Sequence, residues 1–109
     1  MRTLLRFDIT VGNIGTAAMS LGYPSGGDFV YDVCHMHYHY GGFITYELLR
    51  NNTLVLVGSK RAFCLLDFET YTGYNGLGAR PRTPLFTCAN QGISVGWADT
   101  YVSNFAWIT

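Results

Sequence analysis

The chain consists of short segments rich in Val, Ile, Thr, Tyr and Phe, separated by clusters of Gly, Asn, Pro and Ser. Such segments favour β-strands, and the clusters between them favour turns. Because no helical periodicity alternates with the strands, the sequence predicts an all-β fold, an antiparallel β-sandwich-like domain with long loops and little helix. The predicted strands are TLLRFDI, DFVYDVCHMHYHY, FITYELL, TLVLVG, RAFCLLDF and TYVSNFAWIT.

Three further segments have distinct local predictions. ELLRNNTLVLV is typical of a hairpin whose turn lies at residues 50–52. YTGYNGLGARPRTP is rich in Gly and Pro and is predicted to be a loop. AAMSLG is predicted to form a short helical turn.

The composition limits the classes of partner. At 109 residues the chain is expected to form a single domain, residues 1–109, with a hydrophobic content of 49 %. The net charge is zero, which argues against a nucleic-acid surface, and no apolar run reaches the ~20 residues of a membrane span. Only 13 % of residues are charged, about half the usual share. We therefore expect part of the surface to be covered by a partner or by further chain.

All three histidines of the chain lie in the stretch CHMHYHY, at positions 35, 37 and 39. Alternate residues of a strand share one face, so His35, His37 and His39 are expected to form one row. Three neighbouring imidazoles favour their neutral forms, and neutral imidazole is a metal ligand. A three-histidine set with open coordination positions suits a catalytic metal.

The residue types alone do not identify the metal. Imidazole binds Cu, Zn, Ni and Fe, and a three-histidine zinc site that activates water for hydrolysis is a direct competitor. A polar strand face with incidental histidines is the alternative without a metal. A cupin site fits poorly, because the next acidic residue is Glu47, beyond a glycine pair.

CHMHYH resembles the copper-binding motif of the lysyl oxidase family of copper amine oxidases. Further segments resemble the same family in the same order along nearly the whole chain. The resemblance implies oxidation of a primary amine, such as a lysine side chain of an extracellular protein, by O2 to an aldehyde, with ammonia and hydrogen peroxide as the other products. These further segments are TLLRF with NIGT, FITYELL, GSKRAFCLLD and CANQGISVGWADTYVSNFAWIT.

The resemblance also implies a cofactor built from the chain. The family joins a lysine to an oxidised tyrosine as lysyl tyrosylquinone, and the matching residues are Lys60, the only lysine, and Tyr101. Such a quinone would act as a covalent electrophile toward the substrate amine. Asp99 lies two positions before Tyr101, on the same face if the segment is a strand, and is the candidate base or quinone-orienting group.

The three cysteines are assigned from the same resemblance. Cys34 and Cys88 match two positions that are paired in the family, which implies a disulfide between them, and Cys64 is expected to be free. A disulfide and the Asn51-Asn52-Thr53 glycosylation sequon both favour an extracellular or secreted protein.

The sequence departs from the family pattern at both ends. Family catalytic domains have sequence before LLRF and further strands after WIT, so the chain is expected to be a minimal version or a fragment. Unpaired sheet edges favour self-association or pairing with missing segments. Besides the amine oxidase, a metal-binding structural or assembly module of an extracellular polymer and a zinc hydrolase therefore remain open.

Overall fold

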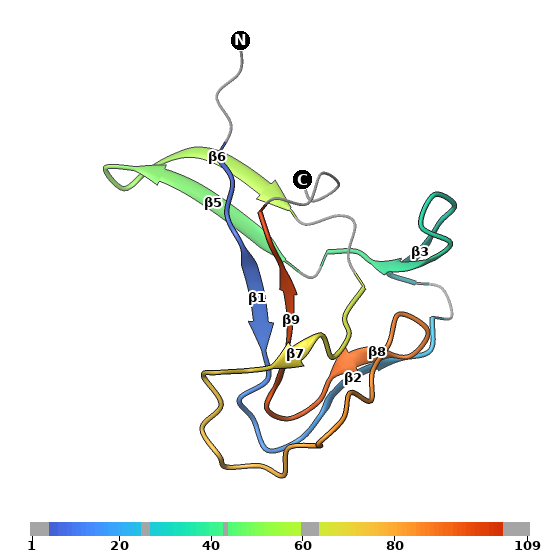
Figure 1. Ribbon diagram of the computed structural model, residues 1–109. Helices are drawn as coiled ribbons and strands as arrows, with labels where there is room; N and C mark the ends of the chain where they lie inside the picture. The colour runs from blue at the N-terminus through green and yellow to red at the C-terminus, as the bar shows by residue number, and fades with distance from the viewer. Residues whose placement is uncertain (1–4, 25–26, 43, 60–63, 104–109) are drawn as a thin grey trace.

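A computed structural model describes residues 5–24, 27–42, 44–59 and 64–103 (Figure 1). This part of the chain contains strands and loops, and the predicted all-β, antiparallel and loop-rich class is confirmed. It contains no helix that is long and apolar enough to cross a membrane. The strands are β1 (Ile9–Gly12), β2 (Met19–Gly22), β3 (Phe29–Asp32), β4 (His37–Tyr40), β5 (Thr45–Arg50), β6 (Thr53–Ser59), β7 (Glu69–Thr70), β8 (Gln91–Ile93) and β9 (Trp97–Tyr101).

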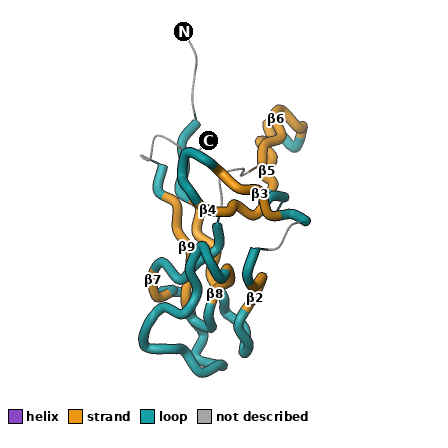
Figure 2. The backbone as a smooth tube through the Cα atoms, turned by 90° about the vertical axis from the view of Figure 1, so that its right-hand side faces the viewer, coloured by secondary structure: helices purple, strands orange, loops and turns teal. Residues whose placement is uncertain are grey.

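The strands form four small antiparallel sheets. The largest has the order β1-β9-β7, and the others are the pairs β2-β8, β3-β4 and β5-β6. Strand β1 is therefore paired with the last described strand, with Ile9 opposite Tyr101 (Figure 1). Both views place the β5-β6 hairpin at one end of the molecule and the β2-β8 pair at the other (Figure 2).

The β5-β6 hairpin confirms the prediction made from ELLRNNTLVLV. Its two central turn residues, Asn51 and Asn52, have positive φ angles of 49° and 63°. Asparagine tolerates this left-handed conformation, and two such residues in succession match the twist of the flanking strands. Register runs from Arg50 opposite Thr53 to Thr45 opposite Ser59.

Several predicted elements are wrong in the structure. Strand β1 begins only at Ile9, the last residue of the predicted strand TLLRFDI, and residues 5–8 form no strand. AAMSLG does not form a helical turn, because Met19–Gly22 is strand β2 and pairs with β8. DFVYDVCHMHYHY is not one strand but the hairpin β3-β4, whose four-residue turn spans 33–36. The amide of Met36 closes this turn on the carbonyl of Asp32, at 2.8 Å.

The predicted strand in RAFCLLDF is also wrong for its described residues. Residues 64–68 form no strand, and residues 61–63 lie outside the described part of the chain. The backbone of this segment is instead bonded to three different partners. The carbonyl of Leu65 accepts from Gly92, the amide of Asp67 donates to Phe86, and the amide of Phe68 donates to Ala98. Their donor–acceptor distances are 3.1, 3.2 and 3.0 Å.

Leu65, Ile93 and Trp97 form the core, with Val11, Met19 and other apolar side chains packed around them. Every residue from Gln91 to Asp99 is buried, so the segment running through β8 and β9 is the centre of the fold. Gly92 is required there, since a Cβ at this position would collide with the carbonyl of Met19. The predicted loop over residues 71–84 is confirmed and contains no strand.

Asp67 is the polar centre of this core. Its carboxylate is 5 % exposed and accepts hydrogen bonds from the Ser94 amide at 2.7 Å and hydroxyl at 2.6 Å. It also accepts from the amides of Leu85 and Phe86, at 2.9 and 3.2 Å. A buried carboxylate needs several such donors to offset its desolvation. Asp67 thus holds the loop before β8 against the turn that follows it.

Candidate metal centre

The three histidines come together at one end of the β3-β4 hairpin. His37 and His39 are alternate residues of β4 and share a face, as predicted. His35 is not part of that strand, because it lies in the turn at 33–36. The turn folds its side chain back onto the other two, so the predicted cluster forms although the predicted single row does not.

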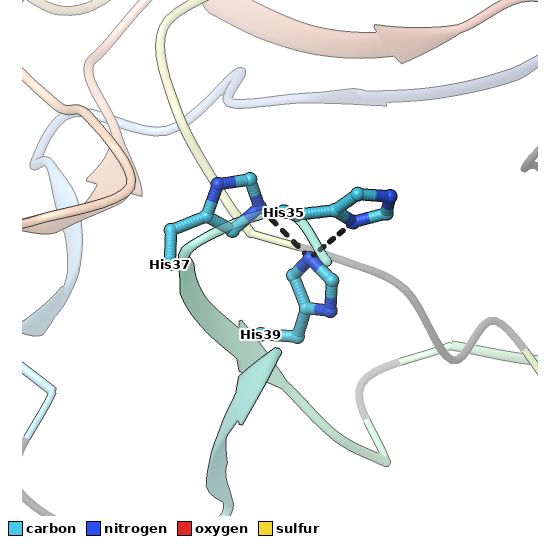
Figure 3. A group of neighbouring side chains, drawn as sticks. All are labelled: His35, His37 and His39. Carbon is cyan, nitrogen blue, oxygen red and sulfur yellow. Dashed lines mark hydrogen bonds between the residues drawn. The ribbon is translucent and has the colours of Figure 1, made fainter. Parts of the chain in front are cut away.

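The imidazole nitrogens converge on His39 (Figure 3). Its Nε2 atom lies 2.8 Å from Nε2 of His37 and 3.3 Å from Nδ1 of His35. A candidate ligand nitrogen from each ring lies within 4.8 Å of the other two, which makes the trio a possible metal site. His39 is buried, His37 is half-buried and His35 is exposed, so the cluster opens toward solvent on one side.

Asp32 lies beside this cluster, and the sequence did not predict it as a residue of the site. One carboxylate oxygen, Oδ1, accepts from the amides of Cys34 at 2.8 Å and His35 at 3.0 Å. The other, Oδ2, lies 3.4 Å from Nδ1 of His39 and 3.7 Å from Nδ1 of His35. The backbone hydrogen bond from His35 is the main cause that lowers the pKa of Asp32 below its ordinary value, with further contributions from the Cys34 amide and the two imidazoles.

The only sequence signal for Asp32 is its residue type. Aspartate is favoured at the first position of a turn, because its side chain can accept from backbone amides two and three residues later. The segment that follows, Val33 to Met36, contains none of the usual turn residues.

The histidines open into a cavity of about 400 Å³ that also reaches the C-terminal strand. Tyr101, at the end of β9, lines the same cavity as the three imidazoles. The remaining lining residues are Cys64, Leu66 and Cys88. Residues from four separated stretches of the chain therefore line one cavity.

Tyr101 is held in place by two neighbours. Its hydroxyl donates to the carbonyl of Cys64 at 2.8 Å. Burial raises the pKa of Tyr101 well above its ordinary value, and the charge of Asp99 and a hydrogen bond with its side chain raise it further. The phenol is therefore kept protonated in the protein without a bound metal ion.

Asp99 and Tyr101 lie on the same face of β9, which confirms that part of the prediction. Asp99 is only 2 % exposed, and it is not among the described residues that line the cavity. The structure thus brings Asp99 to the phenol rather than to the open space.

Lys60, the other predicted half of the cofactor, lies outside the described residues. In the sequence it falls between the end of β6 at Ser59 and Cys64, which lines the cavity.

The predicted disulfide is wrong. Cys88 is bonded to Cys64, with the two Cα atoms 5.4 Å apart, and Cys34 is a free, exposed cysteine. The reason lies in the turn at 33–36, which places Cys34 on the outside of the hairpin. Cys64 and Cys88 are instead brought together by the hydrogen bonds that join residues 65–67 to residues 86–92.

Gln91 connects the β3-β4 hairpin, which carries the histidines, to the part of the cavity lined by Cys64 and Cys88. Its fully buried side chain accepts from the amide of Leu65 at 3.1 Å. It also donates to the carbonyls of Tyr38 in β4 at 2.9 Å and Cys88 at 3.2 Å. Gln91 lies in the segment CANQGISVGWADTYVSNFAWIT, which resembles the family, but the sequence predicted no role for it.

The donor set fits a transition-metal ion. Three imidazoles with their nitrogens directed at one another are suited to Cu or Zn, and the adjoining cavity leaves room for further ligands. Tyr101 at the same cavity adds a group that copper chemistry with O2 can use, whereas hydrolysis at zinc has no need of it.

Comparison with known proteins agrees with this arrangement. The model of the lysyl oxidase family, described as lysyl oxidase, matches residues 1–108. Neither the curated proteins nor the solved structures gave a match. Because the family model covers essentially the whole chain, the protein belongs to the lysyl oxidase family.

Proposed function

We propose that the protein is a copper-dependent amine oxidase that acts on primary amines. In the overall reaction one amine, one O2 and one water give one aldehyde, one ammonia and one hydrogen peroxide. The carbon that bears the nitrogen loses two electrons, and O2 takes them up to form the peroxide. The family match supports this class of reaction.

The observation that carries the proposal is the shared cavity. His35, His37 and His39 would hold the metal, and Tyr101 reaches the same space from the other end of the chain. Copper, when bound, supplies one-electron chemistry with O2, and the quinone supplies an electrophilic carbonyl for the substrate amine.

The chain's own residues have separate tasks in this proposal. Tyr101 supplies the ring of the quinone, and the carbonyl of Cys64 orients its hydroxyl. Lys60 supplies the amine that is joined to that ring. Its nitrogen must be deprotonated for this, and burial lowers the pKa of a lysine from its usual ~10.4.

Asp99 is proposed to orient the ring of Tyr101. Asp99 is 2 % exposed, and its charge and side chain are among the causes that raise the pKa of the Tyr101 phenol. Its position favours the orienting role over that of the base that removes a proton from the substrate carbon, which must reach the cavity.

The proposed substrates are primary amines in an extracellular setting, such as lysine side chains of extracellular proteins. The Cys64–Cys88 disulfide agrees with secretion, because disulfides persist in oxidising compartments. The cavity is large enough for an alkyl amine, and it is open to solvent beside the exposed His35.

Hydrogen peroxide release with alkyl diamines tests the proposal. Copper-loaded, aerated protein is expected to produce peroxide, and Lys60→Arg and Tyr101→Phe are each expected to abolish it. Tyr31→Phe, on the exposed face of β3, is the matched control and should keep full activity. Full peroxide release by Lys60→Arg would show that the quinone assignment is wrong.

Metal analysis of the same preparations separates the alternatives. Copper bound without peroxide release or a quinone would indicate a structural or assembly module. Zinc with hydrolytic activity would indicate the hydrolase.

A further inference from the structure

Asp32 contacts the histidine cluster in two ways, through its two carboxylate oxygens. Oδ1 accepts the amides of Cys34 and His35, at 2.8 and 3.0 Å. These bonds, with that from the Met36 amide to the Asp32 carbonyl, shape the turn that returns His35 to the cluster. This first contact is a turn cap of the kind that Asp and Asn both provide.

The second contact is made to an imidazole. Oδ2 lies 3.4 Å from Nδ1 of His39, whereas the other ring nitrogen, Nε2, faces His35 and His37. A neutral imidazole carries one proton and one lone pair. A carboxylate beside Nδ1 favours the proton there, which leaves the lone pair on Nε2.

We propose that Asp32 is a positioning residue of the metal centre, which holds the His39 ring with its proton on Nδ1 and its Nε2 lone pair directed at the metal position. The inference rests on the proposed metal site of the same three histidines. Ligating histidines commonly donate their second N–H to a carboxylate, which fixes the ring and makes the ligand more basic.

Three observations favour this role over a turn cap alone. His39 is the most buried of the three rings, so its orientation is set by neighbours rather than by water. It is also the ring on which both imidazole–imidazole contacts converge (Figure 3). Finally, Oδ2 of Asp32 lies nearest to Nδ1 of His39, at 3.4 Å, whereas both imidazole contacts of this ring are made by its other nitrogen, Nε2.

Asp32→Asn separates the two roles. The asparagine keeps a side-chain oxygen for the amides of Cys34 and His35, so the turn cap is preserved. It loses the charge, and its NH2 group then faces Nδ1 of His39 as a donor. The favoured tautomer of His39 is therefore reversed, which puts the proton on Nε2.

The matched control is Asp28→Asn. Asp28 is exposed on the same hairpin, and it is its backbone carbonyl that accepts from Gly41, at 2.8 Å. Asp28→Asn changes the net charge by the same amount and leaves the environment of His39 intact.

The first readout is the affinity for Cu(II), measured by competition with a chromophoric chelator. Asp32→Asn is expected to bind Cu(II) about 10- to 100-fold more weakly than the wild type, the usual cost of losing such a carboxylate. Asp28→Asn is expected to match the wild type. Equal affinity of Asp32→Asn and Asp28→Asn would overturn the inference.

The second readout is the tautomer of His39 in the metal-free protein, from the nitrogen NMR shifts of the ring. The wild type and Asp28→Asn are expected to be protonated at Nδ1, and Asp32→Asn at Nε2. An unchanged tautomer in Asp32→Asn would also overturn the inference. If the wild type binds no Cu(II), the proposed function fails, but the tautomer measurement still tests Asp32.

Discussion

At the scale of single residues, neighbouring groups determine the contacts of the two His39 ring nitrogens and the pKa of Tyr101. His39 has a carboxylate near one ring nitrogen and two imidazoles near the other. Tyr101 is one of eight tyrosines, yet its phenol is enclosed with Asp99 and bonded to a backbone carbonyl. Neither environment can be inferred from a residue type, because each depends on partners that are distant in the sequence.

The raised pKa of Tyr101 predicts its behaviour in alkali. The folded state favours the neutral phenol, so this contribution to stability is full below the unfolded pKa of about 10 and is lost as the pH rises above it. Tyr101 of the folded protein should not form phenolate in the ordinary tyrosine range.

Ultraviolet phenolate absorbance of the metal-free protein measures this directly. Near pH ~10 the wild type and Tyr101→Phe are expected to show the same absorbance change, because Tyr101 does not contribute to it. A smaller change in Tyr101→Phe would contradict the raised pKa. The lost hydrogen bond to Cys64 should lower the free energy of unfolding by only about 1 kcal/mol.

At the scale of elements, the sequence predicted local patterns well and their interruptions poorly. The two asparagines of the β5-β6 turn indicate a hairpin, because asparagine tolerates a positive φ angle. The turn after β3 has no such marker. It includes Met36 at a φ of 59°, a conformation that methionine rarely adopts, and it is stabilised by the side chain of Asp32. The sequence pattern therefore predicted one strand over DFVYDVCHMHYHY, where the chain forms strands β3 and β4 joined by a turn.

The cysteine pairing also could not be obtained from the sequence. Three cysteines allow several pairings, and only the packing of residues 64–67 against residues 86–92 brings Cys64 beside Cys88. The resemblance assigned the pairing by position, whereas the hairpin turn carries Cys34 to the surface.

The observed pairing gives a prediction at this scale. Cys64→Ser or Cys88→Ser should lower the free energy of unfolding by about 3 kcal/mol, as expected for opening a loop with a sequence separation of 24. Cys34→Ser should have little effect, since that thiol is exposed. Denaturant unfolding measures both, and non-reducing peptide mapping identifies the bond directly. A peptide that joins Cys34 to Cys88 would show that the pairing is wrong.

At the scale of the whole molecule, a few buried polar groups join distant segments. Asp67 and Gln91 occur in two of the segments that resemble the lysyl oxidase family, and both are buried hydrogen-bond centres. Gln91 ties β4 to the cavity wall, and Asp67 holds the loop before β8. The motifs outside the histidine cluster therefore contribute to the fold that builds the site, a role which the sequence alone did not reveal.

Asp67→Ala should therefore destabilise the whole fold. Removing the carboxylate leaves the amides of Leu85, Phe86 and Ser94 without their acceptor, at a cost of about 3 kcal/mol or more. Asp28→Ala, which removes an exposed carboxylate, is the control and should change stability by less than about 0.5 kcal/mol. Thermal unfolding compares them, and equal melting temperatures would contradict the role of Asp67.

The surface of the β5-β6 hairpin also concerns the whole molecule. Several of its apolar side chains, including Leu49, Val55 and Leu56, are more than half exposed. Self-association and pairing with a further segment of chain remain predictions, and sedimentation of the purified protein at several concentrations would measure the first.

The central claim is that the histidine cluster and Tyr101 form one copper site, in which Lys60 and Tyr101 become a quinone. Peptide mass spectrometry of copper-loaded, aerated protein tests this most directly. We expect one cross-linked peptide that contains both Lys60 and Tyr101, and that is absent from protein prepared without copper. Separate, unmodified Lys60 and Tyr101 peptides from fully copper-loaded protein would contradict it.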